Sequence, residues 1–322
     1  MKIKHPLAIV IPAYKSVFLR EALDSVANQS CREFQLYIGD DASPENLGDI
    51  VRDYSSELPI QYRRFEKNLG RVSLMNHWKR CLRMSDEPWV CVFSDDDVLE
   101  PRCIEKFYEE LRLTEGRHDL YRFNTTSIDE HGRVLSENSA HPQNETGPDF
   151  LVSRLRGGRT STAQELIFSR AAWESAGGFP DFPLGWASDD AFISMLGARK
   201  PIRVIPGPRL KWRLSGRNIS TVNSFKLAIQ KLQACREFVE WSANFLKKNP
   251  PSEGPLTNGE LAALLEDWFF MQMIYRRQIM TFKSSLQVDK LAASLWNRPR
   301  GYGFLKTMKF NYHLTRDKVL SK

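Results

Sequence analysis

Short apolar runs alternate with amphipathic segments along the first hundred residues of this chain. Four runs rich in β-branched and aromatic residues predict strands: Leu7 to Pro12, Phe34 to Gly39, Ile60 to Phe65 and Trp89 to Phe93. The segments between them carry apolar residues at helical spacing and predict helices at 18–26, 46–55 and 72–84, the last with Val72 among its inward residues. Strands that alternate with helices imply a mostly parallel, Rossmann-like α/β sheet flanked by helices.

The pattern becomes more varied beyond residue 100. The remaining elements predicted for the α/β part are a helix at 103–113, strands at 120–124 and 164–168, and a short helix at 171–176 closed by Gly177 and Gly178. We expect the polar stretch 129–149 to form an exposed hairpin or loop. From about residue 225 the spacing is helical, at 225–247, 261–282 and 288–296. We therefore predict an α/β domain over residues 1–223 and a C-terminal helical region over residues 224–322.

Composition narrows the class of protein. The 322 residues are 42% hydrophobic and 26% charged, which is typical of a folded domain with an apolar core. Five scattered cysteines without a C-x-x-C spacing indicate neither a disulfide framework nor a zinc site. Because the sequence shows no secretory signal and no apolar run of about 20 residues, we expect a cytoplasmic protein.

Basic residues are unevenly distributed. The net charge is +7 and the sequence pI is about 9.1, which favours anionic partners. One stretch from 199 to 217 has basic residues and no acidic one, and the tail from 298 to 322 is nearly as basic. This tail is either a solvated surface or a peripheral contact with anionic lipid at the inner face of a membrane.

Acidic residues follow two of the predicted strands. Asp40 and Asp41 come directly after the second strand, and three consecutive aspartates, 95–97, come after the fourth. The carboxyl ends of parallel strands meet at one edge of a sheet, so we expect these groups to converge there with Tyr14, which follows the first strand. A helix cap explains one aspartate, whereas three together require a positive partner. Mn²⁺ or Mg²⁺ fits, with the phosphates of a substrate completing its ligand shell.

Several segments in this order resemble the glycosyltransferases of family 2, which have the GT-A fold. They are IVIPAY at 9–14, LDSVANQ at 23–29, IGDDAS at 38–43, NLG at 68–70, and FSDDD at 93–97 with Pro101 after it. The resemblance implies that Pro12, Ala13 and Tyr14 hold the nucleotide base, and that Asp41 or Asp40 accepts a hydrogen bond from uracil. It also implies that Asn68 and Arg71 lie near the nucleotide, Asp95 contacts ribose or sugar, and Asp96 and Asp97 bind the metal. The family's common spelling would put its first acid at Ser94, so these last roles are open to a shift of one residue.

Two later segments extend the resemblance. Gly177-Gly178-Phe179-Pro180 followed by Asp189-Asp190 is similar to the acceptor side of the family, where an acidic pair supplies the general base. The alternative is that Asp189 and Asp190 only favour a helix N-terminus. Segment 212–220 is similar to the loop that closes over the diphosphate, which implies phosphate contacts for Arg213 and Arg217.

The resemblance implies an inverting transfer of one sugar from a nucleotide-diphosphate donor, with UDP the expected nucleotide, to a hydroxyl of a glycan or lipid-linked acceptor. We expect a role in bacterial surface polysaccharide or glycoconjugate synthesis. The alternatives are a sugar nucleotidyltransferase and a non-catalytic membrane-surface scaffold of the same fold. We expect no nucleic-acid partner, because the acidic edge repels phosphates and no aromatic-basic stacking platform is evident.

Overall fold

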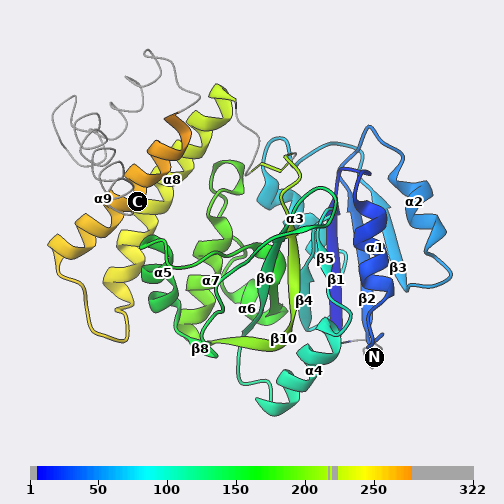
Figure 1. Cartoon of the computed structure of the whole chain (residues 1–322), viewed down its shortest axis with the longest axis horizontal. Helices are drawn as coiled ribbons and strands as arrows, with labels where there is room; N and C mark the ends of the chain where they lie inside the picture. The colour runs from blue at the N-terminus through cyan, green and yellow to red at the C-terminus, as the bar shows by residue number, and fades with distance from the viewer. Residues whose placement is uncertain (1–5, 217, 220–223, 278–322) are drawn as a thin grey trace, which may run out of the picture.

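The computed structural model of the chain describes residues 6–216, 218–219 and 224–277, and Figure 1 shows their arrangement. A single mixed sheet runs through the molecule in the order β3-β2-β1-β4-β9-β6-β10-β5, with β7 beside β6 and β8 beside β10. Its strands are β1 Leu7–Ala13, β2 Phe34–Asp40, β3 Ile60–Arg64, β4 Trp89–Val92, β5 Val98–Leu99, β6 Leu120–Ile128, β7 Val134–Glu137, β8 Asn144–Glu145, β9 Leu166–Ser169 and β10 Ile202–Arg213. Strands β3, β2, β1 and β4 are parallel, as are β6 and β10, while β9 runs antiparallel between the two groups.

Helices cover both faces of the sheet and one end of it (Figure 1). The helices are α1 Leu19–Ala27, α2 Leu47–Asp53, α3 Leu74–Leu82, α4 Cys103–Leu113, α5 Gly147–Leu155, α6 Arg170–Ser175, α7 Ser188–Arg199, α8 Phe225–Lys248 and α9 Asn258–Arg277. Two 3-10 turns, η1 Ala163–Glu165 and η2 Pro183–Gly185, join the later elements. The predicted α/β fold with a mostly parallel central sheet is therefore confirmed.

Strand β1 shows why the central strands are apolar throughout. Leu7, Ile9 and Ile11 point into one core cluster, whereas Ala8 and Val10 point into a second cluster on the opposite face of the sheet. Side chains alternate between the faces of a strand, so a strand covered on both sides needs apolar residues at every position. The carboxyl end of β1 is consequently held rigidly in the middle of the sheet.

Three predictions need correction or completion. Val72 does not face inward: it is 83% exposed, because it precedes Ser73, whose side chain caps the N-terminus of α3. The hydrophobic pattern does not predict β10, because Pro206, Gly207 and Pro208 interrupt it and the register with β6 shifts between Ile205 and Arg209. The polar stretch does form an exposed hairpin strand, β7, against β6.

Helices α8 and α9 share a core with the α/β part. Leu151 and Leu155 of α5 and Ala191 of α7 belong to the same apolar cluster as Phe238 of α8 and Phe269 of α9. The boundary near residue 223 stays a prediction, and the predicted helix at 288–296 and the basic tail lie outside the described residues.

Helices α5 and α7 approach each other through glycine. A Cβ atom on Gly147 would lie 2.0 Å from the Ser194 carbonyl oxygen, and one on Gly197 would lie 2.7 Å from the Gly147 Cα. These obstacles are backbone atoms, which cannot move aside without separating the helices. The two glycines therefore set the distance between α5 and α7.

Gly147→Ala is expected to lower the free energy of unfolding by about 1–3 kcal/mol, because the added methyl group overpacks the helix contact. Thermal and urea unfolding measure this loss. Gly259→Ala is the matched control, since an added Cβ at Gly259 of α9 meets nothing within 4 Å. This control should be neutral or slightly stabilising, by no more than about 1 kcal/mol. Equal stability of the two variants would contradict the close helix contact.

Candidate active site

A cavity of about 730 Å³ lies beyond the carboxyl ends of β1 and β4. It brings together ten of the predicted site residues: Pro12, Tyr14, Asp41, Asn68, Arg71, Asp95, Asp96, Asp97, Asp189 and Asp190. Ala13, Asp40 and Arg213 are not among its lining residues, and Arg217 lies outside the described residues. Carboxylates that are distant in sequence thus share one rim of the sheet.

Asp95 ties the end of β4 to the turn after β1. Its Oδ2 atom accepts hydrogen bonds from the backbone N–H groups of Tyr14 and Lys15, both at 2.8 Å. Burial raises the pKa of Asp95, against the opposing effect of the neighbouring Lys15 ammonium. The Asp95 side chain therefore orders the Tyr14 turn at the mouth of the cavity.

Lys15 is a site residue that the sequence analysis does not predict. Its Nζ atom lies 2.8 Å from Asp96 Oδ2 and 3.7 Å from Asp95 Oδ1, and its side chain lines the cavity. Burial lowers the Lys15 pKa, but the surrounding carboxylates outweigh this effect and the net pKa is raised, so the ammonium stays charged. Lys15 places a cation against two of the three consecutive aspartates.

Asp97 and Arg213 are joined by hydrogen bonds next to the cavity. Asp97 accepts a hydrogen bond from the Arg213 backbone N–H at 2.8 Å, and burial followed by the charge of Asp96 raises its pKa well above the ordinary value. The Arg213 guanidinium is fully buried and donates to the Asp96 carbonyl oxygen at 2.8 Å and to Glu21 at 2.6 Å. The predicted phosphate contact of Arg213 is therefore not supported, because the guanidinium is turned away from the cavity and holds the Asp96–Asp97 turn.

The adjacent residues Asp40 and Asp41 have different surroundings. Asp40 is fully buried and accepts hydrogen bonds from Tyr62 and Arg64, so it serves the packing of β2 against β3 and does not reach the cavity. Asp41 lines the cavity and accepts hydrogen bonds at 2.8 Å from the backbone N–H groups of Leu69 and Gly70. Of the two aspartates predicted to contact uracil, only Asp41 lines the cavity, so the prediction is kept for Asp41 alone.

The second acidic pair begins helix α7 on the other side of the cavity. Asp190 Oδ1 accepts a hydrogen bond from Arg154 Nε at 2.9 Å. Burial, together with the negative charge of Asp190, raises the pKa of Asp189 to about 7. Both carboxylates line the cavity, so the pair offers a proton acceptor that is poised near neutral pH.

The remaining wall contains aromatic residues that the sequence analysis does not assign to the site. Trp186 precedes α7, Trp212 lies near the end of β10, and Trp268 and Gln272 come from α9. Nothing in the local sequence distinguishes these tryptophans from core residues. Helix α9 thus contributes directly to the same cavity as the α/β part.

The carboxylates of the cavity are the candidate ligands for a metal ion. Among the described residues there is no group of three or more His, Cys, Asp or Glu side chains arranged to hold one. Asp96 and Asp97 do line the cavity side by side, and Mg²⁺ or Mn²⁺ commonly takes one or two protein carboxylates and completes its shell with water and phosphate oxygens. Two carboxylates facing a cavity fit an ion that arrives with a diphosphate.

The fold and the acidic rim are those expected of a glycosyltransferase with the GT-A fold. Residues 8–164 match the sequence model of Glycosyl transferase family 2, so this part of the chain is similar to that family. Of the two enzyme classes left open by the sequence, this match supports the glycosyltransferase.

Two curated relatives are similar in part. An uncharacterized glycosyltransferase of Methanocaldococcus jannaschii is 23% identical over 135 residues, which are 41% of this chain and 45% of that protein. The chondroitin synthase of Escherichia coli is 25% identical over 229 residues, 70% of this chain and 31% of that protein. The chain therefore aligns with less than half of the length of either relative.

Solved structures of TarS from S. aureus have the same fold. The crystal structure of TarS 1–349 in complex with UDP-GlcNAc superposes with a TM-score of 0.67 at 16% identity and covers 90% of this chain and 80% of that one. The complex of the same fragment with UDP gives a TM-score of 0.63, also at 16% identity, and covers 94% of this chain and 88% of that one. No helix in the described part of the chain is both long enough and apolar enough to cross a membrane.

Proposed function

We propose that this glycosyltransferase moves a single sugar from a UDP-sugar to a hydroxyl of a glycan or lipid-linked acceptor, with inversion at the anomeric carbon. The observation that carries the proposal is the shared cavity, which is lined by the Asp95–Asp97 turn, by Tyr14 and by the Asp189–Asp190 pair. The structural neighbour TarS was crystallised with UDP-GlcNAc, which supports a UDP-sugar as the donor. The similarity to a chondroitin synthase supports a carbohydrate acceptor and a role in bacterial surface polysaccharide or glycoconjugate synthesis.

The residues divide into a donor side and an acceptor side. On the donor side, Asp41, Asn68 and Arg71 hold the nucleoside and the Tyr14 turn bounds it. Asp96 and Asp97 would hold Mn²⁺ or Mg²⁺, which when bound neutralises the charge that grows on the departing diphosphate. The Lys15 ammonium, 2.8 Å from Asp96 Oδ2, adds a second positive charge beside these carboxylates. Donor binding thus orients the anomeric carbon toward the opposite wall.

On the acceptor side, the carboxylate pair takes the proton from the attacking hydroxyl. The hydroxyl oxygen forms its bond to the anomeric carbon on the face opposite the diphosphate, and the bond to the diphosphate breaks. A single displacement of this kind inverts the configuration at that carbon. We assign the proton to Asp190, with its neighbour Asp189 as the matched alternative. We further propose that the reaction takes place in the cytoplasm, at the inner face of the membrane if the basic tail binds anionic lipid.

A thermal-shift screen with UDP-, GDP- and dTDP-sugars, with and without Mn²⁺, tests this proposal. We expect one UDP-sugar to raise Tm only when Mn²⁺ is present, because the proposed site needs the ion to hold the diphosphate. A ligand at about 100 times its Kd stabilises the folded protein by about 2.7 kcal/mol, which is enough to give a clear shift. The same UDP-sugar should release UDP slowly in the absence of acceptor. Equal UDP affinity with and without Mn²⁺, or no shift with any nucleotide sugar, would overturn the proposal.

A further inference from the structure

Arg154 connects the acceptor side of the cavity to a buried polar layer behind it. The residue belongs to α5, and its side chain is 29% exposed where it lines the cavity. Its Nε donates to Asp190 Oδ1 at 2.9 Å, and its Nη1 donates to the Arg159 carbonyl oxygen at 2.8 Å. Two hydrogen bonds in different directions fix the plane of the guanidinium, and the Asp190 side chain it faces is only 4% exposed.

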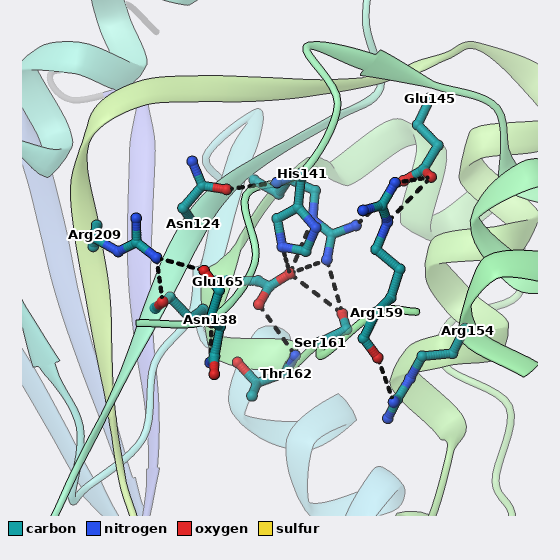
Figure 2. A network of polar contacts seen from close by, with 12 residues as sticks. Asn124, Asn138, His141, Glu145, Arg154, Arg159, Ser161, Thr162, Glu165 and Arg209 are labelled. Atoms are coloured by element: carbon teal, nitrogen blue, oxygen red, sulfur yellow. Dashed lines mark hydrogen bonds and ion pairs between the residues drawn. The ribbon is translucent and has the colours of Figure 1, made fainter. Parts of the chain in front are cut away.

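The two neighbouring arginines, Arg122 and Arg159, form ion pairs with other carboxylates. Figure 2 shows Arg159 between Glu145 and Arg154, with its guanidinium on Glu145 at 2.9 Å and its carbonyl oxygen toward Arg154. The fully buried Arg122 donates through Nε to Glu165 at 2.9 Å. The positive charges of Arg122 and Arg159 are therefore matched, and Arg154 is the guanidinium that faces the acidic pair.

We propose that Arg154 is a positioning residue for the transfer reaction: it fixes the Asp190 carboxylate toward the cavity and places a positive charge beside the Asp189–Asp190 pair, so that Asp190 can accept the proton of the acceptor hydroxyl. This inference rests on the proposed function, in which the acidic pair supplies the base. It adds a residue from a helix outside the recognised acidic motifs. The close approach of α5 and α7 at Gly147 and Gly197 keeps the Arg154 and Asp190 backbones at a constant separation.

The charges around the pair give the direction of the effect. Asp189 is the negative group next to Asp190, and the negative charge of Glu165 raises the pKa of Arg154. Lys231 of α8 lies over the Trp186 ring, 5.0 Å from its centre. Two neighbouring carboxylates resist ionising together, and a guanidinium at hydrogen-bond distance favours the charged form. Removing the Arg154 charge therefore raises the pKa of the pair, and a larger fraction of the base is protonated at a given pH.

The test compares Arg154→Gln with Arg154→Lys in the pH dependence of UDP release from UDP-GlcNAc with Mn²⁺. For Arg154→Gln we expect the acid limb of kcat to move to higher pH by about 1–3 units, the range by which a neighbouring arginine displaces a carboxylate pKa. Arg154→Lys should keep the limb near that of the parent, because the charge remains, and should lower kcat because the second hydrogen bond is lost. Donor Kd should be unchanged in both variants.

Arg156→Gln is the matched control. Arg156 is exposed at the end of the same helix, and its substitution should leave the pH profile unchanged. A profile for Arg154→Gln that coincides with those of the parent and this control would overturn the inference, even if kcat falls, because a purely structural defect does not move the acid limb.

A second measurement does not depend on turnover. Carboxyl resonances of the ¹³C-aspartate-labelled full chain can be titrated, with Asp190 assigned as the signal missing from Asp190→Asn. We expect the titration of the Asp189–Asp190 pair to move to higher pH in Arg154→Gln, and an unmoved titration would overturn the inference. If the parent neither binds nor cleaves any UDP-sugar, the proposed function fails, whereas this titration still decides whether Arg154 acts on the Asp189–Asp190 pair.

Discussion

Replacing Asp190 by Asn is expected to reduce kcat by about 10²–10⁴-fold, the typical contribution of a positioned general base. The amide has nearly the same shape and can still accept the hydrogen bond that Arg154 Nε donates at 2.9 Å, so the fold of α7 should be preserved. It cannot take a proton from the acceptor hydroxyl. The Kd for the UDP-sugar with Mn²⁺ should stay within about twofold of the parent value, since Asp190 lies across the cavity from the Asp95–Asp97 turn in the proposed arrangement.

Turnover and donor binding must therefore be measured on the same preparations, by UDP release and by isothermal titration. Asp189→Asn is the matched control, because it removes a carboxylate of the same pair without removing the partner of Arg154. We expect a smaller loss of kcat for Asp189→Asn than for Asp190→Asn. The reverse order would assign the base to Asp189, whose pKa is raised to about 7, and would contradict the role given to Asp190 and Arg154.

The sequence predicts the donor side of the site well because that side is built from strand ends. Hydrophobic periodicity places Leu7–Ala13 and Trp89–Val92 side by side in a parallel sheet, and this pairing is what brings Tyr14 close to Asp95. Residues that directly follow strands are located by the strand assignment itself. No knowledge of tertiary packing is needed beyond the parallel order of the strands.

Choices between neighbouring residues could not be predicted in the same way. Asp40 and Asp41 follow the same strand, but the last residue of β2 points into the layer of Tyr62 and Arg64, while the next one points toward the cavity. A shift of one residue reverses the direction of a side chain on a strand, so the distinction requires the end of the strand to within one position. A sequence pattern does not give strand ends with that accuracy.

Residues that act through long-range packing gave no signal in the sequence. Arg154 lies in the last turn of α5, and its significance depends on the contact between α5 and α7 at two glycines. Lys15 looks like an ordinary surface lysine until the turn after β1 is set beside the turn after β4. The sequence places Arg213 in a loop over the diphosphate, whereas the structure makes it the last residue of the interrupted strand β10, with its side chain fully buried.

Asp96→Ala is expected to abolish the dependence of donor binding on Mn²⁺. With Mn²⁺ present, the Kd for UDP should rise by about a hundredfold or more, because the ion that Asp96 would help to hold would stabilise the bound diphosphate by several kcal/mol. Isothermal titration of UDP into the parent and the variant, each with Mn²⁺ and with EDTA, measures the effect. Asp53→Ala is the control, since Asp53 forms an exposed ion pair with Arg20. This substitution should leave the Kd for UDP unchanged both with Mn²⁺ and with EDTA.

The EDTA arm separates a lost metal ligand from a damaged site. Asp96 is the nearer of the two ion-pair partners of Lys15, at 2.8 Å against 3.7 Å for Asp95, so its removal leaves the ammonium less neutralised and removes one negative charge from the diphosphate side of the cavity. Without Mn²⁺ the variant should therefore bind UDP at least as tightly as the parent does. A variant that binds UDP more weakly than the parent in EDTA would show that Asp96 supports the site structurally, and a variant that keeps the Mn²⁺ effect would show that the metal is held elsewhere.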